Sequence, residues 1–125
     1  MICIDIDGKV TERKYNGNLQ EIYDAIGATL FDIVMLRGNA LMFVDDEGLM
    51  KEGAVERINW KATYLRMNQW MENPQEIDWN VARTMLPPTI VGNVCILEGR
   101  DDGETVDIGD AARELVLETI GESVL

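Results

Sequence analysis

Residues 30–48 read LFDIVMLRGNALMFVDDEG, and this stretch decides the fold that we predict for the chain. Two apolar runs, 30–36 and 40–44, flank an Arg-Gly-Asn turn, in which Gly-Asn supplies the positive φ angles of a tight hairpin. Both runs are apolar at odd and even positions alike, whereas an antiparallel strand with one wet face alternates. We therefore predict a β-hairpin that is covered on both of its faces.

The residues before the hairpin predict two strands and a helix. Residues 1–6 alternate between apolar and polar, and an Asp-Gly turn leads into a more polar returning strand over 9–14. Asn18 and Glu21 have the spacing of a capping box. We expect a short amphipathic helix that begins there and ends at Gly27, where a left-handed residue belongs.

The residues after the hairpin predict three helices and one more strand. A long helix over 54–72 is followed by a second helix over 73–85, which a double proline ends. The last predicted strand is 89–97. A final helix follows it, capped by Asp107 or Asp110.

This order, β-β-α-β-β-α-α-β-α, predicts an α+β fold in which a small antiparallel or mixed sheet of about five strands packs with helices. The 125 residues have room for one domain, 1–125, with a helical insertion at about 53–86. The longest apolar runs fall far short of the roughly 20 residues of a membrane span. Because no charged-then-apolar leader precedes the first strand, we expect a cytoplasmic protein.

The chain is acidic, with a net charge of −12. Residues 1–48 carry nine acids and four bases, 49–97 carry five of each, and 98–125 carry nine acids and two bases. Such a chain repels DNA and anionic membranes, so we expect no direct binding to either. Histidine, the commonest general base and metal ligand, does not occur. Cys3 and Cys95 lie in apolar runs and are expected to be buried, reduced thiols.

The predicted helix over 54–72 carries the candidate binding site, because it has two apolar stripes where one core needs only one. The first stripe consists of Val55, Ile58, Ala62 and Leu65. The second stripe and its basic flank consist of Arg57, Trp60, Lys61, Tyr64, Met67 and Met71. Aromatic rings beside Arg and Lys can stack a base and bind phosphate, or anchor a protein interface. Packing inside the chain, a protein interface and a site for a nucleotide-like ligand all stay open.

Two kinds of acidic motif have catalytic or metal-binding interpretations. Asp5 and Asp7 resemble the nucleophile motif of haloacid-dehalogenase-type phosphatases, which use Mg²⁺, but Lys9 stands where that motif has Thr. That fold also needs a parallel sheet, so an acidic hairpin turn is the simpler interpretation. The acidic clusters 45–47 and 101–104 lack the spacing of a calcium loop. We predict no metal site, no cofactor and no catalytic residues.

The order of features also resembles a family of small proteins encoded mainly by phages, plasmids and bacterial accessory genomes and catalogued as a domain of unknown function. The shared features are a short opening strand, the helix NLQEIYDAIGA, the hairpin FDIVMLRGNALMFVDDEG, the segment TIVGNVCILEGRDDGE and a capped terminal helix. The resemblance covers about 1–52 and 87–122, and IVGNVCIL is its most specific part. It implies a phage or mobile-element setting.

Together these features predict a non-enzymatic accessory protein that acts stoichiometrically on a host or defence-related partner, as in counter-defence. Self-association into a homodimer or higher oligomer is also expected, because the hairpin and the long helix offer more apolar surface than one small core uses. The alternatives are sequestration of a nucleotide-like ligand and an acidic mimic of DNA. A Mg-dependent phosphatase using Asp5 and Asp7 is the weaker alternative.

Overall fold

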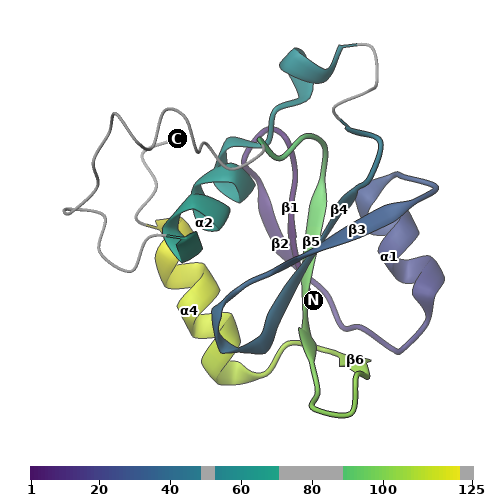
Figure 1. Ribbon diagram of the computed structural model, residues 1–125, viewed down its shortest axis with the longest axis vertical. Helices are drawn as coiled ribbons and strands as arrows, with labels where there is room; N and C mark the ends of the chain where they lie inside the picture. Colours follow the sequence, from purple (N-terminus) through teal and green to yellow (C-terminus); the bar gives the residue numbers. More distant parts are fainter. Residues whose placement is uncertain (49–52, 71–88, 122–125) are drawn as a thin grey trace.

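The computed structural model describes residues 1–48, 53–70 and 89–121 (Figure 1). Within them, three α-helices and six strands form three layers. The open sheet lies in the middle, with α1 on one side and α2 and α4 on the other (Figure 1). The predicted α+β class and the antiparallel sheet are confirmed.

The sheet consists of β1 (Ile2–Ile4), β2 (Val10–Glu12), β3 (Phe31–Met35), β4 (Ala40–Asp45), β5 (Val94–Gly99) and β6 (Thr105–Val106). The strand order is β2-β1-β5-β4-β3, β6 pairs with the end of β5, and every pair is antiparallel. The centre of the sheet is therefore β5, and the predicted hairpin β3–β4 forms one side of it. The short strand β6 is an addition to the predicted set.

The helices and short 3₁₀ turns are α1 (Leu19–Ile26), η1 (Arg37–Asn39), η3 (Ala54–Arg57), α2 (Trp60–Trp70) and α4 (Asp110–Gly121). The capping box of α1 is confirmed. The Asn18 side chain accepts hydrogen bonds from backbone N–H groups of the first turn, and the Glu21 side chain accepts the backbone N–H of Asn18. Gly27 ends α1 in the left-handed conformation, at φ 66°. The predicted positive φ angles of the hairpin turn are found at Gly38 and Asn39.

Both faces of the sheet carry a core, because the strands place alternate side chains on opposite sides. The core under α1 includes Met1, Cys3, Ile22, Ile26, Phe43, Cys95 and Leu97. The core under α2 and α4 includes Ile2, Ile4, Met42, Ala62, Leu65, Val94, Ile96, Val116 and Ile120. The two cysteines are buried free thiols, as predicted. They lie opposite each other on β1 and β5, and burial raises the pKa of Cys95 to about 12.

The predicted cover on both faces of the hairpin is found for β4 but not for β3. The side chains of β4 are buried or half-buried throughout, whereas Ile33 and Met35 of β3 are 41% and 80% exposed. The cause is the short helix α1, which packs on β4 and β5 and meets β3 where the Tyr23 ring contacts Phe31, 5.3 Å between centroids. Beyond Phe31, the α1 face of the edge strand is exposed.

The predicted helix over 54–72 is wrong in its first part, because α2 begins at Trp60. Asn59 precedes it as a capping residue, and its side-chain oxygen accepts a hydrogen bond from the backbone N–H of Ala62 at 3.1 Å. Of the first stripe, Ala62 and Leu65 are fully buried as predicted, while Val55 is 81% exposed on η3. The predicted helix over 73–85 lies outside the described residues.

The terminal helix is confirmed, but neither predicted aspartate caps it. Because the backbone N–H of Arg113 donates to the carbonyl of Gly109 at 2.9 Å, Gly109 occupies the capping position. Asp110 is the first residue of α4. Asp107 instead contacts the start of the chain.

Candidate functional site

The predicted second stripe lies on α2, but only its first residue is strongly exposed. The Trp60 side chain is 52% exposed, while Tyr64 and Met67 are half-buried. Met71 lies outside the described residues. The described part of the stripe therefore offers one exposed aromatic ring rather than a continuous aromatic surface.

The two predicted cations lie on different elements and contact other parts of the chain. The Lys61 ammonium group donates a hydrogen bond to the carbonyl of Gly8 at 2.8 Å, which ties α2 to the β1–β2 turn. Arg57 lies in η3, before the helix, and its carbonyl accepts the backbone N–H of Gly92 at 2.8 Å. A binding site for phosphate that combines both groups on one flank of a helix is not formed.

Asn59 is a buried residue whose role the sequence pattern did not predict. Its side-chain amide donates to the carbonyls of Ile4 and Gly92, both at 3.0 Å, and the backbone carbonyl of Asn59 accepts the hydroxyl of Thr63 at 2.8 Å. These bonds join β1, the segment before β5 and the start of α2. The available signal was an asparagine ahead of a run of helix-forming residues, which is a typical capping position.

The acids of the phosphatase-like motif form a hairpin turn. One carboxylate oxygen of Asp5 accepts the backbone N–H groups of Asp7 at 3.0 Å and Lys9 at 2.8 Å. The preceding strand β1 has antiparallel neighbours on both sides. Both observations favour the acidic turn over the phosphatase interpretation. In the described segments, no three acidic or cysteine side chains lie close enough to hold a metal ion.

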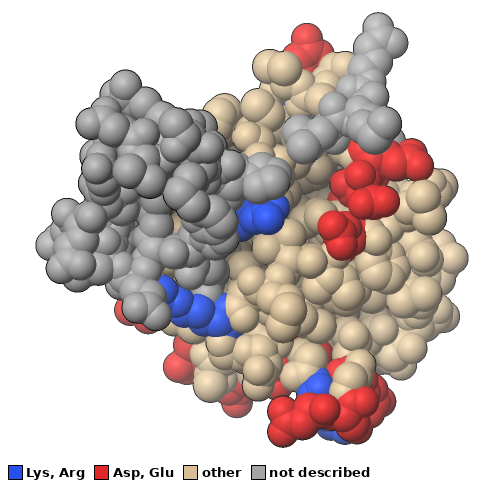
Figure 2. Space-filling model, in the orientation of Figure 1, with Lys and Arg blue, Asp and Glu red and all other residues tan. Residues whose placement is uncertain are grey.

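The acidic clusters occupy opposite ends of the sheet. Residues 45–47 begin at the last residue of β4, at the Val94 end of β5, while 101–104 form the turn at its Gly99 end. Figure 2 shows separate groups of acidic side chains around a broad uncharged area. A mimic of DNA needs its carboxylates along one elongated face. The two acidic clusters, at opposite ends of the sheet, do not form such a face.

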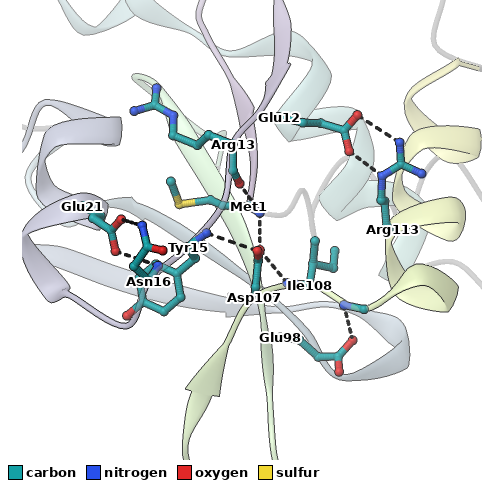
Figure 3. Close-up of polar contacts among 11 residues, drawn as sticks. Met1, Glu12, Arg13, Tyr15, Asn16, Glu21, Glu98, Asp107, Ile108 and Arg113 are labelled. Carbon is teal, nitrogen blue, oxygen red and sulfur yellow. Dashed lines mark hydrogen bonds and ion pairs between the residues drawn. The ribbon is translucent and has the colours of Figure 1, made fainter.

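Asp107 is the centre of a polar cluster that joins the start of the chain to the segment before α4 (Figure 3). Its carboxylate forms an ion pair with the Met1 amino group and accepts the backbone N–H groups of Tyr15 at 3.1 Å and Ile108 at 3.0 Å. Beside it, the Arg113 guanidinium forms a bidentate pair with Glu12 of β2. These contacts fasten β2 to α4.

These contacts also shift the pKa values of the two carboxylates. Partial burial raises the pKa of Asp107, but the hydrogen bonds and the charge of the Met1 amino group outweigh it, so the pKa lies below its ordinary value. For Glu12, the hydrogen bonds from Arg113 lower the pKa. Both carboxylates hold elements together, so this cluster has a structural role.

A cleft of about 510 Å³ runs along β3 on the side of the sheet that faces α2. Its apolar lining includes Val34, Leu36, Val44 and Ile90. Its charged lining consists of Asp32, Arg37, Asp45, Asp46 and Arg66. The cleft offers both apolar and charged side chains to a bound group.

The opposite side of β3 and the residue before it expose apolar side chains. Leu30, Ile33 and Met35 are the exposed large apolar residues here, and the Leu30 side chain is 51% exposed. β3 crosses the front of the view in Figure 1, and in Figure 2 acidic side chains lie at the upper-right end of this area beside uncharged surface. We call Leu30, Ile33 and Met35 the β3 strip. The side chains of Ile33 and Met35 point away from those of Val34 and Leu36, while Ile33 and Met35 also contribute to the lining of the cleft.

The comparisons with known proteins give no family for this chain, since no family model, no curated protein and no solved structure matches it. The phage or mobile-element setting therefore stays a prediction from the resemblance. None of the helices in the described segments has the length and apolarity that a bilayer crossing requires.

Proposed function

We propose that this chain is a non-enzymatic binding protein that forms a stoichiometric complex with a partner protein through the β3 side of its sheet. One observation carries the proposal. Ile33 and Met35 are exposed on β3 and also contribute to the lining of the cleft of about 510 Å³, which reaches Val34 and Leu36 of the same strand. Contiguous exposed apolar surface beside a cleft is typical of interaction sites.

The rest of the sheet supports the same assignment. The central strand β5 is buried from Val94 to Leu97, and the side chains of β4 are buried or half-buried. The apolar side chains that the sheet leaves exposed therefore gather on β3. A partner that covers them would remove apolar surface from water at a favourable free energy of about 25 cal/mol per Å².

The alternative of a nucleotide-like ligand has less support from the geometry. The Lys61 ammonium group donates to the carbonyl of Gly8, and Arg57 lies on η3 before the helix, where its backbone carbonyl is bonded to Gly92. In the cleft, the arginines are accompanied by three aspartates. Those carboxylates would repel a polyphosphate, so the cleft suits a protein partner better than an anionic ligand.

The partner's biological setting comes from the resemblance. It implies a phage or mobile-element setting, and we propose that the partner in that setting is a host or defence-related protein of the host cytoplasm. The acidic surface would then favour a partner with a basic surface, because complementary charge speeds association.

Quantitative affinity capture from a bacterial lysate tests the proposal with two matched variants. Met35→Lys places a charge on the β3 strip, whereas Val55→Lys places the same charge on an equally exposed valine of η3, outside the cleft. We expect the wild type and Val55→Lys to retain one protein at a 1:1 ratio and Met35→Lys to lose it. Equal retention by both variants, or no stoichiometric partner, would contradict the proposal.

A further inference from the structure

We infer that the partner supplies an extended segment with basic side chains, which adds to β3 as a further strand of the sheet. This inference rests on the proposed function and specifies the chemistry of the partner. It is carried by the backbone groups of β3, by the cleft and the β3 strip on either side of them, and by the charges at the two ends of the strand.

The backbone of β3 has an open hydrogen-bonding edge. Leu36 donates its N–H to the carbonyl of Ala40 at 2.8 Å, and the carbonyl of Leu30 accepts the N–H of Asp46 at 3.3 Å. The even-numbered residues therefore bond to β4, because bonding direction alternates along an antiparallel strand. The residues that direct their N–H and C=O groups to the open edge are Phe31, Ile33 and Met35. In the described part of the chain, the only strand that pairs with β3 is β4.

A strand added at this edge would find a surface for both of its rows of side chains. Alternate side chains of a strand point to opposite faces, so one row would enter the cleft beside Val34 and Leu36. The other row would pack on the exposed Ile33 and Met35. Strand addition typically combines main-chain hydrogen bonds with pockets for alternate side chains. The two features of β3 fit this mode of recognition.

The charges along β3 favour a basic segment. Asp32, Asp45 and Asp46 lie at the end where the strand begins, and Arg37 lies at the other end. In the free protein, the carboxylate of Asp32 accepts the N–H of Ile33 at 2.8 Å, one of the groups that an added strand would use. A Lys or Arg opposite Asp32 would compensate for the loss of that bond.

A second copy of the chain fits this edge less well. Antiparallel pairing of two β3 strands about Ile33 would bring the two Asp32 carboxylates diagonally across the same face, and like charges on neighbouring strands destabilise a sheet. Each copy also carries a net charge of −12. Self-association through β3 is therefore disfavoured. The charge of Asp32 opposes pairing of this edge with the same edge of a second copy.

Selection from a display library of unstructured twelve-residue peptides tests this inference without knowledge of the partner. The immobilised full chain is the target. We expect enrichment of peptides with apolar residues at alternate positions and Lys or Arg near one end. Titration calorimetry of one selected peptide should give 1:1 binding. Asp32→Asn should weaken this binding about two- to fivefold, and raised salt should weaken the wild type similarly.

Ile33→Pro separates strand addition from contact by side chains alone. It removes an N–H that points away from β4, so the β3–β4 ladder is retained. Circular dichroism checks that this variant folds, and Ile33→Ala controls for the lost side chain. We expect Ile33→Pro to abolish peptide binding and Ile33→Ala to weaken it. Amide hydrogen exchange gives a second readout, since the Met35 amide should become protected in the wild-type complex while that of Val55 does not change.

Three results would overturn the inference. The first is the absence of enriched peptides, and the second is a bound peptide that leaves the exchange of Met35 unchanged. The third is a dimer of the wild type that Ile33→Pro dissociates, seen by light scattering against the 14.1 kDa monomer. If the lysate capture still shows a partner that depends on Met35, the proposed function stands and only the added strand is wrong.

Discussion

The two edge strands of this sheet differ in the polarity of the side chains that they expose to water. At one edge, β2 exposes Thr11 and Glu12, and Glu12 is paired with Arg113 of α4. At the other edge, β3 exposes Ile33 and Met35 and borders a cleft. Both edges belong to the same antiparallel sheet and both begin from a hairpin with a neighbouring strand.

Natural sheets protect their edges with charges, short strands or covering elements, because unpaired backbone groups invite association. The β2 edge follows this rule in its polarity and in its ion pair with α4. The β3 edge follows it at Asp32 alone, whose carboxylate accepts the N–H of Ile33. Exposed apolar residues are therefore not a general consequence of edge position in this protein. Their presence on β3 indicates a surface for a partner.

The largest effect should come from Asn59→Ala, because Asn59 joins the inner strand β1 and the segment before β5 to α2. Three buried hydrogen bonds of its side chain, to Ile4, Gly92 and Ala62, would be lost. We expect the free energy of unfolding to fall by on the order of 3 kcal/mol, measured by urea denaturation.

Asn18→Ala is the matched control, because Asn18 caps the exposed end of α1. Its loss should cost about 1 kcal/mol. Equal effects of the two variants would show that the buried network does not support the sheet.

A smaller loss of stability should follow from acidification, because it protonates the carboxylates Glu12 and Asp107 near the β2 edge. The pKa values of Glu12 and Asp107 are lowered in the folded chain. A lowered pKa contributes stability above the pKa of the unfolded chain, and this contribution is lost as the pH falls through the folded value. The free energy of unfolding should therefore decrease below about pH 4. A flatter pH profile is expected for Glu12→Gln with Asp107→Asn, measured by denaturation between pH 7 and 2.

The smallest effect on stability should come from Met35→Lys at the β3 edge. Its side chain is 80% exposed, so the free energy of unfolding should stay within about 0.5 kcal/mol of the wild type. Thermal and urea denaturation measure this. A loss well above 1 kcal/mol would mean that Met35 is covered in the folded chain, and the contrast between the edges would disappear.

Local signals in the sequence predict much of this fold. The capping box at Asn18 and Glu21 and the positive φ angles at Gly38 and Asn39 are properties of a few neighbouring residues, and each is confirmed. The order of strands is not local. β1 pairs with β5 across about ninety residues of chain, and such pairing leaves no mark in a single sequence.

The candidate site was harder to predict for the same reason. A helical wheel that starts at residue 54 places Arg57 and Lys61 on one flank, but Asn59 interrupts the helix by bonding to β1 and to the segment before β5. The sequence identifies the apolar residues of β3. Their exposure, however, depends on the edge position of the strand and on the short length of α1, which meets β3 at Phe31. Both are consequences of tertiary packing.

Amide hydrogen exchange of the free protein tests the contrast between the edges most directly. The amide of Val34 points to β4 and that of Met35 to the open edge, on adjacent residues of one strand. We predict that the Met35 amide exchanges at nearly the rate of an unstructured peptide, whereas the amides of Val34 and Ile96 exchange far more slowly. If the Met35 amide were as protected as that of Val34, the β3 edge would already be covered, and the proposed binding surface would be wrong.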